Sequence, residues 1–191
     1  MPVTTIDPKT ALVVIDLQNS IRAIPGEPYP TDDVIARSAE LAEAFRKRDL
    51  PVVLVRVSFS ADGTDRVPGR TEGQIRPTGT RPDDAEQIVG PLAAHPGDIV
   101  VTKRNWGAFY GTDLDVHLRR RGITQIVLTG VATSFGVEST ARAAHEHGYH
   151  VTLATDAMTD LVADAHDHSI AWVFPRLGET GTTAEILALL G

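Results

Sequence analysis

The sequence predicts an α/β fold in which a parallel sheet lies between two layers of helices, with residues 1–191 forming one domain. Short apolar runs alternate with segments of helical periodicity, the pattern of repeated strand–helix units. The runs are uninterrupted, as in ALVVI at Ala11–Ile15. A strand that helices cover on both faces has this character. A chain of this length can bury a full hydrophobic core.

The elements follow from these patterns and from residues that cap helices. The first helix is expected to be capped by Thr31, with Asp32 and Asp33 in its first turn, and the second, short helix is expected to be capped by Thr112. Strands are expected at Ala11–Ile15, Val52–Val57, Ile99–Thr102, Gln125–Thr129, Val151–Ala154 and Ile170–Phe174. Helices are expected at Thr31–Arg48, between Thr112 and Gly122, at Val137–His147 before Gly148, at Asp160–His168 and at Thr182–Leu190.

Between Ser58 and Pro91 the periodicity fades, and glycine and proline recur. A stretch of this length without regular structure is usually a functional loop or a lid. Its arginines could bind a substrate carboxylate, although a solvated surface loop is the simpler interpretation. These arginines are Arg66, Arg70, Arg76 and Arg81.

Composition excludes several classes of function. A net charge of −7 argues against a nucleic-acid or anionic-membrane surface, and no apolar run is long enough to span a bilayer. The N-terminal residues lack the order of a signal peptide, so a cytoplasmic location is expected. Without cysteine there is no disulfide, thiolate metal site or thiol nucleophile. No cofactor or metal is expected, because no phosphate loop follows a strand and the spacing of His145, His147 and His150 does not suit one helix face.

Three polar features follow predicted strands and would meet at one edge of a parallel sheet, where ligands bind. Asp16 follows ALVVI, Lys103 follows IVVT, and the turn Ala132–Gly136 follows IVLTG. The last is a strand–turn–helix unit, which exposes a turn residue beside free backbone N–H groups. The residue at the position of a nucleophile is Gly136, which has no side chain.

Three segments in this order resemble the isochorismatase-like hydrolases: VVIDLQ, KRNWGAFYGTDLD and LTGVATSFGVESTARAA. This superfamily includes isochorismatase, nicotinamidase and N-carbamoylsarcosine amidohydrolase, and the resemblance covers nearly the whole chain. It implies a six-stranded parallel sheet flanked by helices, a three-layer Rossmann-like arrangement, and a homodimer or larger homo-oligomer. It also implies a cis peptide bond between Val131 and Ala132, with backbone N–H groups directed into the site.

In most of this family an aspartate, a lysine and a cysteine form a catalytic triad. Asp16 and Lys103 match the first two, and Gly136 stands where the cysteine would be. Covalent catalysis from that position is therefore impossible. Isochorismatases carry glycine there and cleave a vinyl ether, with the aspartate as acid. The resemblance thus implies a small carboxylated substrate, Asp16 as general acid, Lys103 as the residue that orients substrate, and room for substrate at Gly136.

The turn differs from that of true isochorismatases, which carry Tyr-Ala-His where this chain has Ala132–Thr133–Ser134. The identity of the substrate is therefore open. Trp106, Phe109 and Tyr110 either line the site or a dimer contact, or pack the next helix onto the sheet. The residues expected to contact substrate are Gln18, Trp106, Ala132, Thr133, Ser134 and Phe135.

Two alternatives stand beside an acid–base hydrolase. The chain could be a binding or scaffold protein that has lost catalysis. It could also be a Ser134 hydrolase, since Ala132–Gly136 has the A-x-S-x-G form of a nucleophile elbow. Its partners would then be Asp156 or Asp164 with His166 or His168. For the acid–base reading, Lys103 would lower the pKa of Asp16 while burial would raise it.

Overall fold

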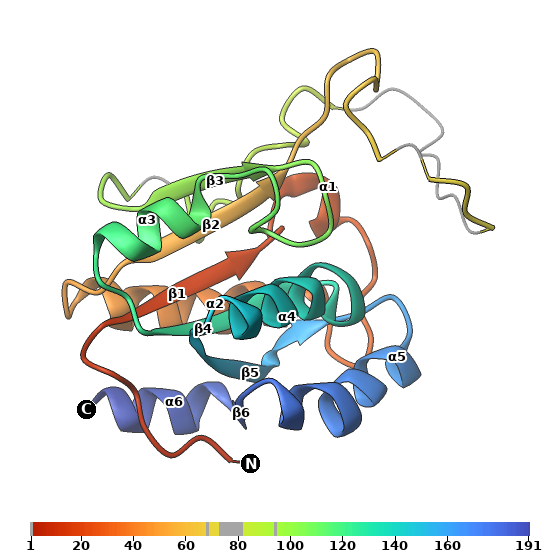
Figure 1. Ribbon diagram of the computed structural model, residues 1–191. Coiled ribbons are helices and arrows are strands. Elements are labelled where there is room, and N and C mark those ends of the chain that lie inside the picture. Colours follow the sequence, from red (N-terminus) through yellow and green to blue (C-terminus); the bar gives the residue numbers. More distant parts are fainter. Residues whose placement is uncertain (1, 68, 73–81, 94) are drawn as a thin grey trace.

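The computed structural model describes residues 2–67, 69–72, 82–93 and 95–191. Six parallel strands form one sheet in the order β3-β2-β1-β4-β5-β6 (Figure 1), which confirms the predicted fold class. The strands are β1 Thr10–Ile15, β2 Val52–Val57, β3 Ile99–Lys103, β4 Gln125–Val131, β5 His150–Thr159 and β6 Glu179–Gly181. The α-helices are α1 Asn19–Arg22, α2 Thr31–Arg46, α3 Leu114–Arg120, α4 Glu138–Glu146, α5 Ala163–His168 and α6 Thr183–Leu190.

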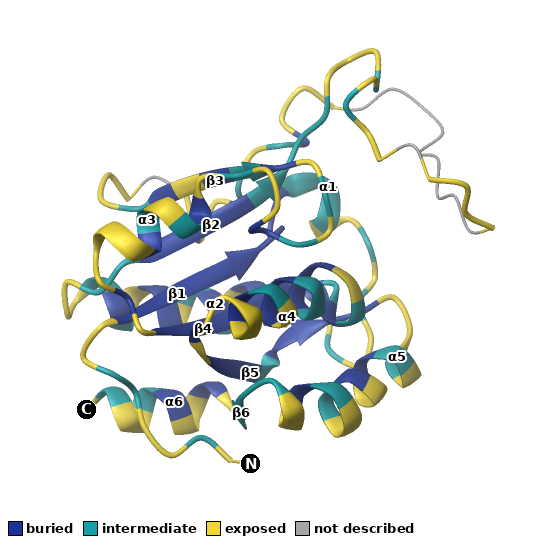
Figure 2. Ribbon diagram, in the orientation of Figure 1, coloured by how far each residue is buried: buried dark blue, intermediate teal, exposed yellow. Residues whose placement is uncertain are grey.

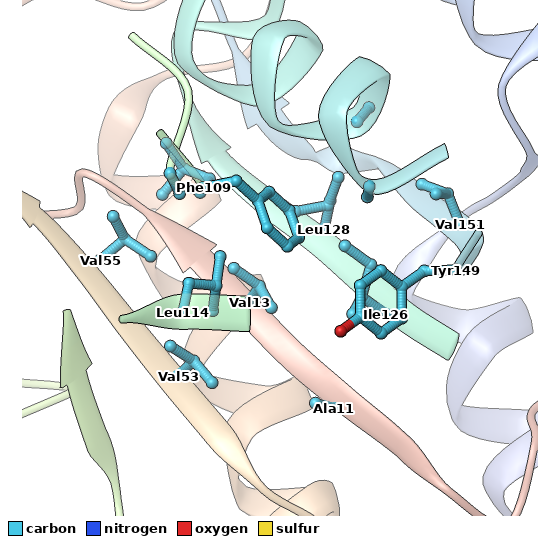
Figure 3. Packing of buried hydrophobic residues seen from close by; sticks show 14 of the residues in the cluster. Ala11, Val13, Val53, Val55, Phe109, Leu114, Ile126, Leu128, Tyr149 and Val151 are labelled. Atoms are coloured by element: carbon cyan, nitrogen blue, oxygen red, sulfur yellow. The ribbon is translucent and has the colours of Figure 1, made fainter. Parts of the chain in front are cut away.

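The strand residues alternate between two apolar cores, one on each face of the sheet. Val13, Val53 and Leu128 face the core under α3 and α4, where Phe109 and Tyr149 pack on them (Figure 3). Their neighbours in sequence face the other core, which lies under α2 and α6. The central strands β1 and β4 are buried along their whole length, the edge strands β3 and β6 are partly exposed, and the helices expose their outer surfaces (Figure 2). This double coverage explains why the strands read as uninterrupted apolar runs.

β1 lies at the centre of the sheet, with β2 and β3 on one side of it and β4, β5 and β6 on the other. The order of the strands reverses between β1 and β4, which are paired in parallel from Thr10 with Gln125 to Ile15 with Gly130. Such a reversal opens a ligand-binding crevice at the carboxyl ends of the two strands. Asp16 and the turn after Val131 begin at these ends. The topology alone therefore brings two of the three polar features together.

The predicted cap of one helix and the predicted start of another were wrong. Pro30, not Thr31, is the N-cap of α2, and the Thr31 hydroxyl instead donates to the carbonyl of Ile24 at 2.8 Å. The helix expected at Asp160–His168 begins only at Ala163, because β5 continues to Thr159 and Asp160 then pairs with Glu27. Asp160 thus lies at a strand end rather than in a helix.

The sixth strand was predicted in the wrong place. Residues Ile170–Phe174 lie in a π-helical turn, Ser169–Val173, and a 3₁₀ turn, Phe174–Arg176. Their apolar groups are buried at helical spacing, with Phe174 fully buried and Trp172 61% exposed. The actual edge strand is β6, a run of three residues too short and too polar to show a strand pattern.

The connection from β2 to β3 leaves the carboxyl edge of the sheet, and its described residues 59–67 and 69–72 extend away from the body (Figure 1). The guanidinium of Arg66 lies over the Phe59 ring at 4.0 Å, and Asp65 pairs with Arg104 at 2.6 Å. Arg76 and Arg81 lie outside the described residues. A further observation concerns membranes: no helix in the described ranges has the length and apolar character needed to cross a bilayer.

Candidate active site

Asp16 is held in an unusual backbone conformation directly after β1. Its φ is +54°, in the left-handed region that few residues other than glycine adopt. Its N–H donates to the carbonyl of Val55 at 2.9 Å, and its carbonyl accepts from the N–H of Gln18 at 2.9 Å. These bonds fix the chain reversal at the strand end. The reversal places a carboxylate at the crevice with the residue only 7% exposed.

Lys103 reaches Asp16 from the end of β3, across the intervening strand β2. Its ammonium lies 2.8 Å from Oδ2 of Asp16 and also donates to the carbonyl of Trp106. The Lys103 side chain is 2% exposed, so this is a buried ion pair. The other carboxylate oxygen, Oδ1, is buried and has no hydrogen-bond partner among the described residues. A buried carboxylate oxygen without a partner is costly and indicates that a ligand or a proton completes the site.

Burial and the lysine act in opposite directions on the pKa of Asp16. Desolvation raises it, and the charge and hydrogen bond of Lys103 lower it. Burial is the larger effect and raises the pKa of Asp16 from 3.8 to about 6. Asp16 is then protonated in about half of the molecules at pH 6 and in about a tenth of them at pH 7. The sequence could not show whether burial or Lys103 has the larger effect on the pKa of Asp16, and in the structure burial has the larger effect.

The third part of the site is the turn between β4 and α4. The Val131–Ala132 peptide bond is cis, and residues Thr133–Val137 form one π-helical turn before α4. The carbonyl of Ala132 accepts from the N–H groups of Phe135 and Val137, both at 3.1 Å. Gly136 is buried in this turn. A Cβ built on Gly136 would lie 3.4 Å from the ammonium of Lys103, so the glycine directly adjoins the ion pair.

Comparison with known proteins fits this arrangement. The family model described as isochorismatase domain matches residues 10–185, which include all three parts of the site. The chain belongs to the isochorismatase family. It is 44% identical over 181 residues to the isochorismatase family protein YecD of Escherichia coli O157:H7, covering 95% of this chain and 96% of that protein.

Other members of the isochorismatase family are similar to different degrees. The structure of an isochorismatase family protein from Burkholderia thailandensis matches with a TM-score of 0.93 and 47% identity, covering 97% of each chain. The ureidoacrylate amidohydrolase RutB of Methylobacterium radiotolerans is 32% identical over 176 residues, covering 80% of this chain and 68% of that protein. Family membership makes the chain a hydrolase-like protein and does not fix its substrate.

The Gln18 side chain hydrogen-bonds to the backbone beside the site and does not face the substrate position. Its Nε2 donates to the carbonyl of Val57 at 3.1 Å, and its Oε1 accepts from the N–H of Val57 at 2.8 Å. The side chain is fully buried. It therefore satisfies the backbone at the end of β2, the strand that Lys103 crosses. This bonding differs from the substrate contact that the sequence suggested.

The aromatic residues after Lys103 divide into two groups. Trp106 is 64% exposed and meets the Phe135 ring edge-on at 4.9 Å, so these two rings lie together beside the turn. Phe109 is 7% exposed and packs in the core against Tyr149. Tyr110 is 80% exposed. Trp106 and Phe135 remain candidates for substrate contact, whereas Phe109 packs α3 onto the sheet.

The residues proposed for a serine hydrolase are not assembled around Ser134. The buried ring of His166 lies with Nδ1 2.9 Å from the hydroxyl of Thr133, one residue earlier. Asp156 accepts from the N–H of Thr183 at the start of α6, and so serves that helix. Asp160 accepts from the backbone N–H of Ser134 at 2.7 Å.

Asp160 and the pairing of His166 with Thr133 were missed from the sequence. An acidic residue directly after an apolar strand, the signal that singled out Asp16, could have identified Asp160 if the end of β5 had been placed correctly. Within the part of the chain that the structure describes, no group of three or more histidine, aspartate, glutamate or cysteine side chains is placed to hold a metal ion.

Proposed function

We propose that this chain hydrolyses a vinyl ether of a small carboxylated metabolite, with Asp16 as general acid and without a covalent intermediate. The Asp16 carboxyl protonates the enol carbon, and an oxocarbenium-like species forms. Water adds its oxygen to the cationic carbon and returns a proton to Asp16. The resulting hemiketal collapses to a ketone and an alcohol, which breaks the ether bond on the enol side.

The observation that carries this proposal is the protonatable carboxylate beside an empty nucleophile position. Burial raises the pKa of Asp16 to about 6, which suits an acid that works near neutral pH. Gly136 adjoins the Asp16–Lys103 pair and offers no side chain to attack a carbonyl. A thiol-based amidase mechanism therefore lacks its nucleophile, and an acid-catalysed reaction uses what is present.

Isotopic labelling tests the position of bond cleavage, with isochorismate as the probe. In H₂¹⁸O the proposed mechanism leaves the alcohol fragment without ¹⁸O, because water attacks the enol side. In D₂O the former enol carbon acquires one deuterium from the solvent. Incorporation of ¹⁸O into the alcohol would show substitution at the other carbon and would contradict Asp16 as a carbon acid. Binding of the probe without turnover would instead support the alternative of a binding or scaffold protein.

The pH profile of the reaction should follow the protonation of Asp16. The acid must be protonated to react, so kcat/KM should be highest below pH 6 and fall about tenfold per pH unit above it. The measurement is kcat/KM for isochorismate from pH 5 to pH 9, with circular dichroism to show that the fold persists. A profile that rises through pH 6 would indicate a base and would contradict the proposal.

Lys103 is expected to bind the substrate carboxylate through its remaining ammonium N–H, since the other two go to Asp16 and Trp106. Lys103→Met should lower kcat/KM by about 10- to 100-fold, the range for a charge-assisted hydrogen bond. It should also move the break in the pH profile upward, because Lys103 lowers the pKa of Asp16. Arg104→Met is the matched control, since Arg104 pairs with Asp65 in the adjoining loop. An unchanged break in Lys103→Met would contradict this role.

The proposal includes a homo-oligomer, at least a dimer, as family membership suggests. Large apolar side chains on the surface of this chain, including Trp172 and Val162, are compatible with such contacts. Light scattering of the purified protein measures the mass directly. A monomer at micromolar concentration would contradict this part of the proposal.

A further inference from the structure

A buried histidine outside the Asp16–Lys103 pair is tied to the turn that carries Gly136. His166 lies on α5, is 4% exposed, and has Nδ1 2.9 Å from the hydroxyl of Thr133. Thr133 is fully buried at the start of the π-helical turn. The bond joins residues 33 positions apart. It therefore connects α5 directly to the segment that places Gly136 beside Lys103.

The surroundings of His166 favour its neutral form and restrict the position of its ring. Burial lowers its pKa, and the nearby carboxylates of Asp167 and Asp160 oppose this more weakly. The Tyr29 ring meets the imidazole edge-on, with the ring centres 5.8 Å apart. The guanidinium of Arg37 lies over the Tyr29 ring, 5.0 Å from its centre. A neutral imidazole can either accept from or donate to the threonine hydroxyl.

Asp160 makes a second hydrogen bond to the turn, one residue further along, at Ser134. Its Oδ2 accepts from the N–H of Ser134 at 2.7 Å, and its Oδ1 accepts from the N–H of Leu161 at 2.7 Å. Its backbone is paired in both directions with Glu27 at 2.9 Å. Asp160 is 1% exposed, so its hydrogen bond to Ser134 is shielded from water, as is the bond between His166 and Thr133. Consecutive turn residues, Thr133 and Ser134, are thus held by two different elements of the fold.

We propose that His166, through the hydroxyl of Thr133, is a positioning residue that sets the distance of the Gly136 turn from the Asp16–Lys103 pair. This inference rests on the proposed function for its catalytic meaning. Asp160 supports the same turn through the amide of Ser134. A displacement of about 1 Å at such a turn is enough to cost about 100-fold in rate. A role for Thr133 as nucleophile is disfavoured because the residue is fully buried.

The position of the turn can be measured without any substrate. The chain has no cysteine, so Gly136→Cys introduces a single thiol that iodoacetamide can report. Its Cβ would lie 3.4 Å from the Lys103 ammonium and 3.0 Å from Cγ2 of Ile15, which calls for shifts of only a few tenths of an ångström. The adjacent ammonium should lower the pKa of this thiol below the ordinary value of about 8.5, and the Asp16 carboxylate that pairs with the ammonium should make this lowering smaller. The pH at which alkylation is half-maximal then reports the distance between the turn and Lys103.

In the Gly136→Cys background, His166→Leu and Thr133→Val should each move this half-maximal pH toward the ordinary thiol value, by about half a unit or more. The two changes combined should do no more than the larger single change, because they remove the same bond. His166→Asn, which keeps an amide near the position of Nδ1, should restore part of the shift. Thr152→Val is the matched control, since Thr152 is a fully buried threonine on β5 that accepts from the Gln125 side chain on β4 and does not contact the turn.

Half-maximal pH values unchanged in both His166→Leu and Thr133→Val would overturn the inference. So would a shift of equal size in Thr152→Val, which would indicate general loosening of the fold. With isochorismate as substrate, His166→Leu should lower kcat more than it raises KM, and His166→Asn should recover part of kcat. Failure to hydrolyse isochorismate would count against the proposed function only, because alkylation needs no substrate.

Discussion

Asp16→Asn is expected to lower kcat/KM for vinyl-ether hydrolysis by about 1,000-fold or more, since general acid catalysis contributes about 100- to 10,000-fold. Asparagine has nearly the same shape and tolerates the left-handed backbone that Asp16 adopts at φ +54°. It has no acidic proton to give to carbon. The loss should therefore appear in kcat, with KM little changed, in steady-state kinetics with isochorismate.

Two further variants separate chemistry from folding in this experiment. Asp16→Asn leaves the buried ammonium of Lys103 without its carboxylate, which costs stability. Adding Lys103→Met should recover much of that stability without recovering activity. Asp49→Asn is the matched control, because Asp49 has the same φ of +54° and lies at the end of α2, away from the site. If Asp16→Asn retains a tenth or more of the wild-type kcat/KM, measured in the same assay, Asp16 is not the acid.

Gly130→Ala is expected to destabilise the fold by about 3 kcal/mol or more, or to prevent folding. Gly130 has φ +115°, and a Cβ added to it would lie 2.0 Å from the carbonyl oxygen of Ile15 on the neighbouring strand. A side-chain rotation cannot relieve the clash, because it is with the backbone, and it cannot change the positive φ. Ile15 precedes Asp16, so any separation of β1 from β4 also moves the acid. The free energy of unfolding in urea measures the effect.

Two other glycines separate the effect of the positive φ from the effect of the clash with Ile15. Gly122 has φ +65° but nothing within 4 Å of an added Cβ, so Gly122→Ala should cost only about 1 kcal/mol. Gly90 has neither the positive φ nor a close neighbour, and Gly90→Ala should change stability by less than about 0.5 kcal/mol. Equal losses in Gly130→Ala and Gly122→Ala would show that the close approach of β1 and β4 is not the constraint.

Much of the fold could be predicted from the sequence because burial on both faces leaves a strong signal. The strand Val52–Val57 begins with four apolar residues in succession before Arg56, and its observed bounds agree with the prediction. The strand at Ile170–Phe174 failed because a partly buried helical turn can carry as many apolar residues as a strand. β6 has three residues, and nothing local distinguishes so short a strand.

The site was predictable where a residue follows a strong strand and less so where a contact joins distant segments. Asp16 and Gly136 follow the central strands β1 and β4, Lys103 ends the edge strand β3, and the parallel topology brings these strand ends together. The protonation of Asp16 depends on how deeply the carboxyl is buried, which no local pattern records. The bond from His166 to Thr133 depends on how α5 packs, and the sequence analysis considered His166 only as a possible partner of Ser134.

The central claim is that burial keeps Asp16 able to hold a proton near neutral pH despite the adjacent Lys103. Carbon-13 NMR of the carboxyl groups, assigned to Asp16 by its loss in Asp16→Asn, measures the pKa directly. We expect a pKa of about 6 for Asp16, displaced further upward in Lys103→Met. A pKa at or below the ordinary aspartate value of about 4 would contradict it, because an acid that weakly protonated near neutral pH could not drive protonation of carbon.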